Sequence, residues 1–499
     1  MSSYIHTPKT ININDIEKKD YNLSSSQYKG LIMPNDNFKL VKDFLKRKLN
    51  RKDLGIEVGS LNYIEQSPYK FIRTKALQDY SYLPNLTSET ALPIMPGEFV
   101  QMNLKEGDLL ISKDSNIGEI VILDKDYPNH MLSGAIYRLP VKNEWRYYLL
   151  AFIKHGIFRE QLDFMVPKGA TIRHAKTLFL DCKIPLPKKQ QNETIKYISV
   201  LTQAIINKET LIRERHNHIL KIIDTELRNG YKPETFTYNL PNYNNILRTE
   251  RLDTGMYSEL FQRYIHMIHN YKYGYYNDIY CLGFSLSRGQ NLQESNIGKS
   301  IYTEQYHKSF YTLALPTYFS EYGTINKLTY LGNRNHLKVL NKGELVFGAE
   351  GTFRSFLVCD DIEKFITNIH GITLKQDNNN LELSIFVKLF LDYLSEKGII
   401  DCVKVGGHGG SFAQKYWAVI PFPKFQSRKI KELKSLYNSK NEYCTKKLSL
   451  DNFLELDSEY NFSAGIYELD KSAKYLSRLL NIAIDDIIND RDVKISFDI

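Results

Sequence analysis

The sequence predicts an α+β fold in which two pseudo-repeated domains of mixed strands and helices are separated by long helices. Three observations lead to this prediction. The two halves of the chain match at an offset of about 236 residues, a heptad of isoleucines runs through a stretch without proline or glycine, and each half combines short apolar strands with one amphipathic helix.

Length and composition indicate a globular protein of two to four domains, since the chain has 499 residues of which 42% are apolar and 25% charged. Residues 1–10 lack the apolar core of a signal peptide, and the best apolar stretches, such as residues 383–394, are interrupted by Lys388 and Asp392. We therefore expect neither secretion nor a membrane span. The five cysteines are odd in number and include no CxxC pair, which predicts a reduced, cytoplasmic setting.

The charge balance favours a polyanionic partner. Lysine and arginine total 66 against 57 acidic residues, and the 35 tyrosines offer flat apolar faces together with hydroxyl donors. Nucleic acid fits both features. A tyrosine-rich core is the alternative explanation for the second.

Motifs for catalysis are incomplete. The segment Ile297-Gly298-Lys299-Ser300 resembles the end of a phosphate-binding loop, but Gln293 stands where that loop needs glycine. The segment 346–351 resembles the methyl-donor loop of a methyltransferase with the wrong spacing, and Ser67-Pro68-Tyr69 has one proline where the amino-methyltransferase motif has two. No set of histidines and cysteines has the spacing of metal ligands. The sequence predicts a binding protein rather than an enzyme.

The internal repeat rests on an ordered series of matches. The clearest is Ile184-Pro185-Leu186-Pro187 with Ile420-Pro421-Phe422-Pro423, each followed by glutamine and a helix. The other matched pairs are Gly107 with Gly343 before a strand, Gly59, Tyr63 and Phe71 with Gly298, Tyr302 and Phe310, and Leu23 and Tyr28 with Leu252 and Tyr257.

A long helix is predicted over residues 188–228, after the first copy. Isoleucines recur there every seven residues, and about 40 residues of helix span about 60 Å. A shorter heptad face follows the second copy, so the two helices are expected to pair, with single helices packed on separate domains as the alternative. The expected interface residues are Ile198, Ile205, Ile212 and Ile219 in the first helix and Ile430, Leu433 and Tyr437 in the second.

Two divergent copies, each ending in Ile-Pro-x-Pro, glutamine and a helix, resemble the DNA-specificity (S) subunit of type I restriction-modification systems. The resemblance implies that each copy is a target-recognition domain and that the helices form an antiparallel coiled coil that sets the gap between two half-sites. It divides the chain into a first domain over residues 1–187, a spacer helix over 188–230, a linker and second domain over 231–423, and a second spacer helix with a helical tail over 424–499. The tail is expected either to cap the coiled coil or to bind a methyltransferase subunit.

The resemblance also implies partners and excludes resident cofactors. Double-stranded DNA, methyltransferase subunits, most simply two, and restriction subunits are the expected partners, and S-adenosylmethionine, ATP and Mg²⁺ are expected on those subunits rather than on this chain. A recognition subunit of a type II restriction-methyltransferase and a scaffold that binds only proteins are the two alternatives.

Candidate DNA contacts are polar or basic residues in predicted loops, since phosphates and base edges take such side chains. Two of these loops contain glycine, over residues 166–174 and 405–412, and in the second a strand connection that needs left-handed glycines explains the sequence equally well. The candidates are Arg73, Lys113, Asn116, Lys168 and Arg173 in the first domain, and Arg288, Gln290, Arg334, Arg354, His408 and Lys415 in the second.

Overall fold

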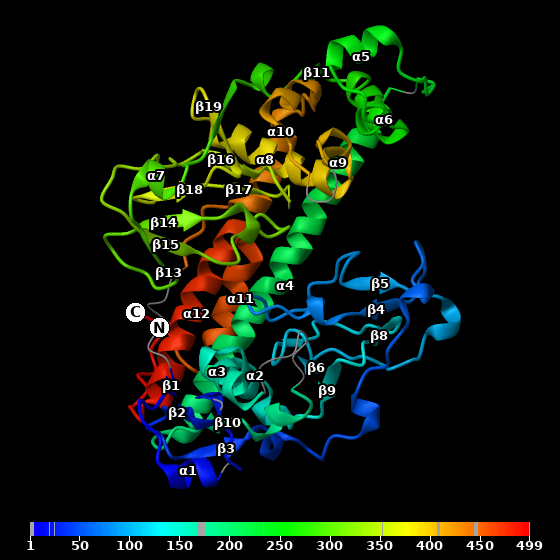
Figure 1. Ribbon diagram of the computed structural model, residues 1–499. Helices are drawn as coiled ribbons and strands as arrows, with labels where there is room; N and C mark the ends of the chain where they lie inside the picture. Colours follow the sequence, from blue (N-terminus) through cyan, green and yellow to red (C-terminus); the bar gives the residue numbers. More distant parts are fainter. Residues whose placement is uncertain are drawn as a thin grey trace. The chain divides into compact units, whose positions relative to one another are not determined.

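The computed structural model describes residues 4–18, 20–23, 25–166, 175–232, 234–351, 353–406, 410–443 and 448–498. The chain forms two compact units of mixed α/β structure (Figure 1), as predicted. Unit 1 comprises Met1–Thr210, Tyr443–Phe462 and Lys471–Ile499, and unit 2 comprises Leu211–Glu442 and Ser463–Asp470. Both units are therefore assembled from segments that are distant in sequence.

The α-helices of the described residues vary from about one turn to about eleven turns in length. Their bounds are α1 Ile13–Glu17, α2 Arg146–Lys154, α3 Gly156–Met165, α4 Gln191–Gly230, α5 Tyr243–Thr249, α6 Glu259–His269, α7 Glu294–Ile297, α8 Leu381–Glu396, α9 Ile399–Val403, α10 Ser427–Tyr437, α11 Phe453–Ser463 and α12 Ile466–Ile488. Within the described part of the chain, no helix is both long and apolar enough to cross a membrane.

Unit 1 has short strands arranged in small sheets with the orders β1-β2, β10-β3, β5-β4-β8 and β7-β6-β9. The strands are β1 Ile5–His6, β2 Gly30–Leu31, β3 Phe38–Leu40, β4 Lys70–Ile72, β5 Ala91–Pro93, β6 Leu109–Ser112, β7 Ile120–Ile122, β8 His130–Leu132, β9 Ile136–Leu139 and β10 Lys183–Pro185.

Unit 2 has sheets with the orders β11-β20, β12-β19-β16-β17 and β13-β15-β14-β18. The strands are β11 Tyr275–Tyr276, β12 Phe284–Arg288, β13 Ile301–Thr303, β14 Tyr311–Ala314, β15 Thr329–Gly332, β16 Leu345–Gly348, β17 Ser355–Leu357, β18 Phe365–Thr367, β19 Gly371–Gln376 and β20 Phe422–Pro423.

The two units share one scheme of strand pairing, which confirms the repeat predicted from the sequence. In unit 1, β4 pairs antiparallel with β5 and parallel with β8, and β14 of unit 2 pairs in the same way with β15 and β18. The central strand β6 lies antiparallel between β7 and β9, as β16 does between β17 and β19. The pairs β10-β3 and β20-β11 complete the match.

The turn before the central strand is also the same in both units. Gly107 and Gly343 have φ of +80° and +88°, in the left-handed region that favours glycine. Their N–H groups donate to the carbonyls of Leu123 and Val358, in each case at 2.8 Å. The predicted equivalence of the two glycines is confirmed.

One predicted equivalence has the wrong register. Tyr63 forms a bridge with Ile94, the residue after β5, and Tyr302 pairs with Leu331 of β15, so the two tyrosines have equivalent places. Phe71, however, lies level with the middle residue of β8, and the residue level with the middle of β18 is Leu313, not Phe310. The chain between the tyrosine and this strand is three residues longer in unit 2, and a fixed offset does not allow for that insertion.

Helix α4 forms as predicted, because no proline or glycine interrupts it before Gly230. All four predicted heptad isoleucines, Ile198, Ile205, Ile212 and Ile219, are buried. The first two belong to the main apolar core of unit 1, where they pack in one cluster with buried residues of α2, α3 and the second half of α12.

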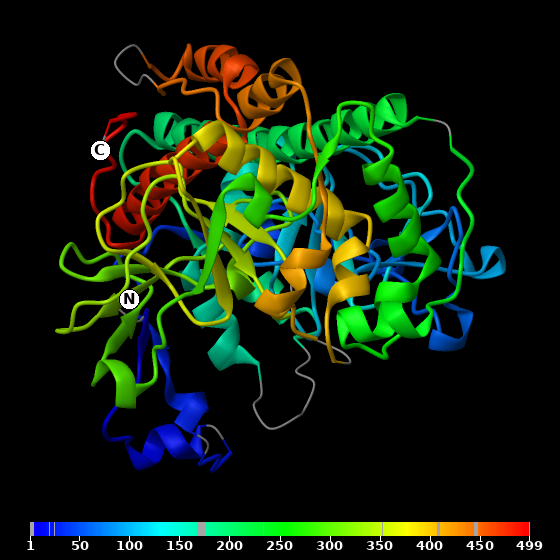
Figure 2. The same ribbon diagram turned by 90° about the horizontal axis from the view of Figure 1, so that it is seen from above.

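The helix that lies along α4 is α12 (Figures 1 and 2). Lys188, just before α4, pairs with Asp490, just after α12, at 2.7 Å. In unit 2, Glu468 near the beginning of α12 acts electrostatically on Arg215 in the second half of α4. The two helices therefore run antiparallel.

The helix that follows the second copy is α10, which ends at Tyr437. Its heptad residues are half-buried (Ile430) or buried (Leu433, Tyr437), and the Tyr437 hydroxyl donates to the Gly323 carbonyl at 3.3 Å. The chain turns there because the carboxylate of Glu468 accepts the N–H groups of Ser439 and Lys440 at 3.1 and 2.9 Å. The antiparallel partner of α4 is therefore the tail helix α12.

A buried ion pair fixes α11 to α4 inside unit 1. The fully buried ammonium of Lys208 lies 2.7 Å from Asp457 Oδ1 and donates to Asn461 Oδ1 at 2.5 Å. Asp457 also accepts from the hydroxyl of Tyr443 at 2.7 Å. Burial lowers the pKa of Lys208, and Asp457 opposes that shift.

We predict that Asp457→Ala lowers the free energy of unfolding by about 3–5 kcal/mol, because it leaves the Lys208 ammonium buried without its counter-ion. Urea unfolding followed by circular dichroism measures the change. The control is Asp451→Ala, since the exposed pair of Asp451 with Lys196 is screened by solvent and should contribute little to stability. Equal effects of the two substitutions would contradict this account.

Candidate nucleic-acid interface

The predicted contacts of the first domain gather at one end of the sheets of unit 1. Strands β4, β6 and β8 end there and β9 begins there, because β8 is parallel to β4 and β9 is antiparallel to β6. Arg73 directly follows β4, Lys113 directly follows β6, and the Lys113 N–H donates to the Ala135 carbonyl at 2.9 Å. We call Arg73 and residues 113–118 and 133–135 the strand-end face of unit 1.

The side chains of this face differ in how they are held. Lys113 forms an ion pair with Asp114 at 2.5 Å, and the amide of Asn116 donates to the carbonyl of Leu77 at 3.2 Å. Arg73 is half-buried and makes no side-chain hydrogen bond or ion pair with the other described residues. Arg73 is therefore the cation of this face that is available to a phosphate without breaking an internal bond.

An acidic cavity of about 310 Å³ borders the same loop. Its lining includes Asn116, Glu119 and Arg159. Glu119 pairs with Arg159 and lies 3.9 Å from the ammonium of Lys154. Burial raises the pKa of Glu119 and lowers that of Lys154 to about 8. Carboxylates in this position disfavour a phosphate and suit a donor such as an amino group.

The corresponding face of unit 2 contains three of the predicted contacts, Arg288, Gln290 and Arg354. Arg288 ends β12 and its guanidinium donates to the Ile369 carbonyl at 3.1 Å. Gln290 bridges to Asn368, the residue after β18. The side-chain carbonyl of Gln290 accepts from the Lys338 N–H at 2.9 Å. We call residues 288–290, 349–351, 353–354 and 368–370 the strand-end face of unit 2.

Two groups at this face were not predicted from the sequence. His370 precedes β19 and lies 2.6 Å from a carboxylate oxygen of Glu350. The ammonium of Lys338 donates to the Arg288 carbonyl at 2.7 Å, which adds a cation beside β12. Neither residue lies in a motif. The repeat is the one signal for His370, since it corresponds in register to Ala135 of unit 1.

Of the remaining described candidates of unit 2, Arg354 lies at this face, whereas Arg334 and Lys415 do not. Arg354 lies in the turn at this face, but its guanidinium donates to the Phe319 carbonyl at 3.1 Å and approaches Glu321 to 3.9 Å. Arg334 follows β15, toward the opposite end of its sheet, and is exposed with no bonded partner among the described residues. Lys415 lies 4.0 Å from Glu250.

Lys168 and Arg173 of the first domain and His408 of the second lie outside the described residues. The residues that follow both glycine-containing loops are equivalent, because the N–H of Ala175 donates to the Lys113 carbonyl and that of Phe412 to the Ala349 carbonyl, at 2.8 and 2.7 Å. The repeat therefore extends to this part of the two faces.

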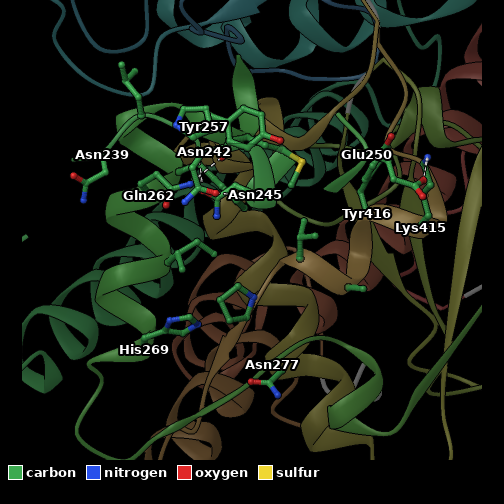
Figure 3. Close-up of a pocket in the computed structure, with 18 residues that line it drawn as sticks. Asn239, Asn242, Asn245, Glu250, Tyr257, Gln262, His269, Asn277, Lys415 and Tyr416 are labelled. Atoms are coloured by element: carbon green, nitrogen blue, oxygen red, sulfur yellow. Dashed lines mark hydrogen bonds and ion pairs between the residues drawn. The ribbon is translucent and has the colours of Figure 1, made fainter. Parts of the chain in front are cut away.

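A further pocket lies elsewhere in unit 2. It has a volume of about 930 Å³ and lies between residues 239–250, helix α6 and residues 415–421 (Figure 3). Asn242, Asn245, Tyr257 and Gln262 cluster on one of its walls. Lys415 is the one lysine or arginine in the lining, so the pocket is not a basic groove for DNA.

Comparison with known proteins supports the resemblance noted in the sequence. Residues 60–214 match the family described as the type I restriction modification DNA specificity domain, which confirms the resemblance over this stretch. A comparison with curated proteins finds no match.

Three solved structures are similar to the chain. One is the S subunit of a type I restriction-modification system from M. genitalium, with 10% identity, 90% of this chain and 95% of that chain covered, and a TM-score of 0.37. The HsdS subunit from Thermoanaerobacter tengcongensis has 10% identity, 91% and 96% coverage and a TM-score of 0.25. A structure described as showing complex assembly and conformational transition of the type I R-M system has 10% identity, 92% and 99% coverage and a TM-score of 0.27.

We predict that Arg73→Ala weakens duplex DNA binding about tenfold and reduces the slope of log K against log salt by about one, as expected for the loss of one phosphate contact. A fluorescence titration of the assembled complex at several salt concentrations measures both quantities. Arg428→Ala is the matched control, because Arg428 is an exposed arginine on α10 that belongs to neither strand-end face. If Arg428→Ala has the same effect as Arg73→Ala, the assignment of this face to DNA is wrong.

Proposed function

We propose that this chain, which carries a type I restriction-modification DNA specificity domain at residues 60–214, is the DNA-specificity subunit of such a system. The observation that carries the proposal is the shared strand pairing of the two units. The matched family covers only part of unit 1 and part of α4, yet β14–β20 repeat the pairing of β4–β10. The chain accordingly has two recognition domains, one for each half of a bipartite target.

Each domain is proposed to recognise one half-site, a short sequence of base pairs that we call a word, through its strand-end face. Arginine and lysine favour guanine and asparagine and glutamine favour adenine in the major groove, while phosphate contacts supply affinity that falls with salt. The two faces have different side chains at equivalent positions, with Lys113 of unit 1 replaced by Ala349 in unit 2. The two words are therefore expected to differ.

Helix α4 is proposed to set the gap between the words. It is one continuous helix of 40 residues to which both units contribute, and a helix of this length measures about 60 Å. Base pairs between the two words need no contact with the chain. Their number becomes part of the recognised sequence.

The enzymatic reactions of the proposed system, methylation and restriction, are assigned to partner subunits. We propose that methyltransferase subunits bring S-adenosylmethionine and that restriction subunits bring ATP and Mg²⁺, with this chain as the scaffold that positions both on the target. The sequence resemblance is the support for this assignment. In the type II alternative, the same recognition chain serves a fused nuclease and methyltransferase, and the identity of the bound partner separates the two cases.

The test is a map of DNA methylation in cells that express this chain together with the methyltransferase gene beside it, compared with the methyltransferase gene alone. A bipartite motif that appears only with this chain is the expected result. If an active methyltransferase is bound to the chain and no motif appears, the restriction-modification function is wrong and a protein scaffold becomes the better explanation.

We predict that removal of one heptad from α4, residues 212–218, shortens the gap in the methylated motif by about three base pairs and leaves both words unchanged. Seven helical residues rise about 10.5 Å, and three base pairs of B-DNA about 10 Å. Insertion of a heptad at the same place is the complementary variant, expected to lengthen the gap by the same amount. Either variant that assembles and methylates with an unchanged gap would contradict the role given to α4.

A further inference from the structure

The loop that follows the central strand ends in a charged residue in both units, but the charge has the opposite sign. In unit 1 the carbonyl of Glu119 accepts the N–H of Ser112 at 2.9 Å, and in unit 2 the carbonyl of Arg354 accepts the N–H of Gly348 at 2.8 Å. Ser112 and Gly348 are the last residues of the matched strands β6 and β16. Glu119 and Arg354 are therefore equivalent in position and opposite in charge.

A neighbouring residue is acidic in both units. Asp79 and Glu321 follow the matched strands β4 and β14 at the same separation along the chain. Glu321 approaches the guanidinium of Arg354 to 3.9 Å. Asp79 lies 3.3 Å from Arg159, a residue of α3 that also forms an ion pair with Glu119. Unit 2 thus places one carboxylate beside one arginine at this position, whereas unit 1 places two.

One oxygen of the Glu119 carboxylate receives no hydrogen bond from the other described residues. The guanidinium of Arg159 binds Oε1. The ammonium of Lys154 lies 3.9 Å from Oε2 and donates instead to the Gln78 carbonyl at 2.5 Å. The side chain of Glu119 is 12% exposed, and it lines the 310 Å³ cavity of unit 1. A nearly buried carboxylate oxygen without a donor favours a partner that brings one.

The other polar groups of the cavity also leave an acceptor available rather than a donor. The side-chain amide of Asn116 donates to the Leu77 carbonyl at 3.2 Å, so its oxygen Oδ1 remains to accept. Arg159 directs its guanidinium to Asp79 and Glu119. Asn116 belongs to the strand-end face of unit 1, and Glu119 directly follows that face in the chain. The two acceptors therefore lie where the proposed function places the DNA.

The four bases differ in the group that such a cavity can bind. In the major groove cytosine presents the amino group N4 and adenine the amino group N6, whereas guanine and thymine present carbonyl oxygens. A carboxylate accepts a hydrogen bond from an amino group and repels a carbonyl oxygen. Arg354, at the equivalent position of unit 2, carries donors and no acceptor, so unit 2 lacks this preference.

We propose that Glu119 is a specificity-determining residue of unit 1, which accepts a hydrogen bond from the exocyclic amino group of one base in its word. The base is cytosine or adenine, since these two share the amino group. This inference rests on the proposed function, because it requires that the strand-end face meets the DNA. At one position of this word, Glu119 favours C·G over G·C or A·T over T·A.

The first experiment maps methylation in cells that express the methyltransferase gene with the unaltered chain or with Glu119→Gln. Arg159 holds the remaining side-chain oxygen of the glutamine, so its N–H₂ group replaces Oε2 and offers a donor where an acceptor was. We expect the preference for the amino base to fall at least about tenfold at one position of one word, with the gap and the other word unchanged. Glu106→Gln is the matched control, because Glu106 is an exposed carboxylate of unit 1 before β6, at the opposite end of that strand.

The second experiment removes the amino group from the DNA instead of the carboxylate from the protein. The assembled complex is titrated with the target duplex and with one in which purine replaces adenine, or 2-pyrimidinone replaces cytosine, at the assigned position. The unaltered complex should bind the substituted duplex about tenfold more weakly, as expected for the loss of one base contact. The Glu119→Gln complex should bind the two duplexes equally. A purely structural role of Glu119 would weaken both duplexes alike.

An unchanged motif with a folded Glu119→Gln chain would overturn the inference, and so would equal weakening of binding to all duplexes. Circular dichroism verifies the fold of the variant. If the variant does not fold, the substituted duplex decides with the unaltered chain, and the inference fails if no position of either word depends on an amino group. A bipartite motif that Glu119→Gln leaves intact rejects this inference alone, whereas a bound, active methyltransferase without any motif rejects the proposed function as well.

Discussion

The buried apolar stripe of α4 is the constraint on which both units depend. Its first half lies in the main core of unit 1, and its second half buries Ile212, Ile219, Ile223 and Leu227 in unit 2. Each residue of an α-helix rotates by about 100°, so a single insertion would turn every later side chain away from its core. The helix tolerates change in length only in steps that keep the stripe on one side. The permitted length of α4 and the stability of both cores are therefore determined by the same residues.

The repeat separates what the units share from what distinguishes them. The strand pairing, the left-handed glycines Gly107 and Gly343, and the turns closed by the hydroxyls of Tyr28 and Tyr257 are common to both. The loops at the strand ends differ, with Lys113 in unit 1 and the His370–Glu350 pair in unit 2. A shared scaffold with different loops is the arrangement expected when one fold serves two recognition tasks.

Much of the fold follows from patterns that are local in sequence. The heptad predicts α4, and the Ile-Pro-x-Pro matches predict two copies, because periodicity and short motifs survive without knowledge of contacts. The end of α10 does not follow, since Glu468 forms it from about 30 positions later in the chain. The register of Phe71 was also missed, because only strand pairing reveals the insertion before Leu313.

The candidate contacts show the same limit. Loop position and side-chain type place Arg73 and Lys113 at one face, but they do not tell which polar groups are already satisfied inside the protein. Arg354 and Gln290 have side chains that could bind bases, but both form hydrogen bonds inside the protein. Lys338 acquires its place beside Arg288 only through the fold. A sequence lists donors and acceptors, whereas the structure decides which of them remain available.

The position of α11 and α12 in the chain has a consequence for biosynthesis. Unit 1 begins at the amino terminus, yet its core is complete only when Tyr443–Phe462 and Lys471–Ile499 have joined it. Unit 2 lies between these parts, so a ribosome makes nearly all of unit 2 before unit 1 can close. Until then the side of α4 that α12 covers is exposed to solvent. The ammonium of Lys208 also lacks its counter-ion Asp457 during this time. A chain that ends before α11 therefore lacks part of the core of unit 1.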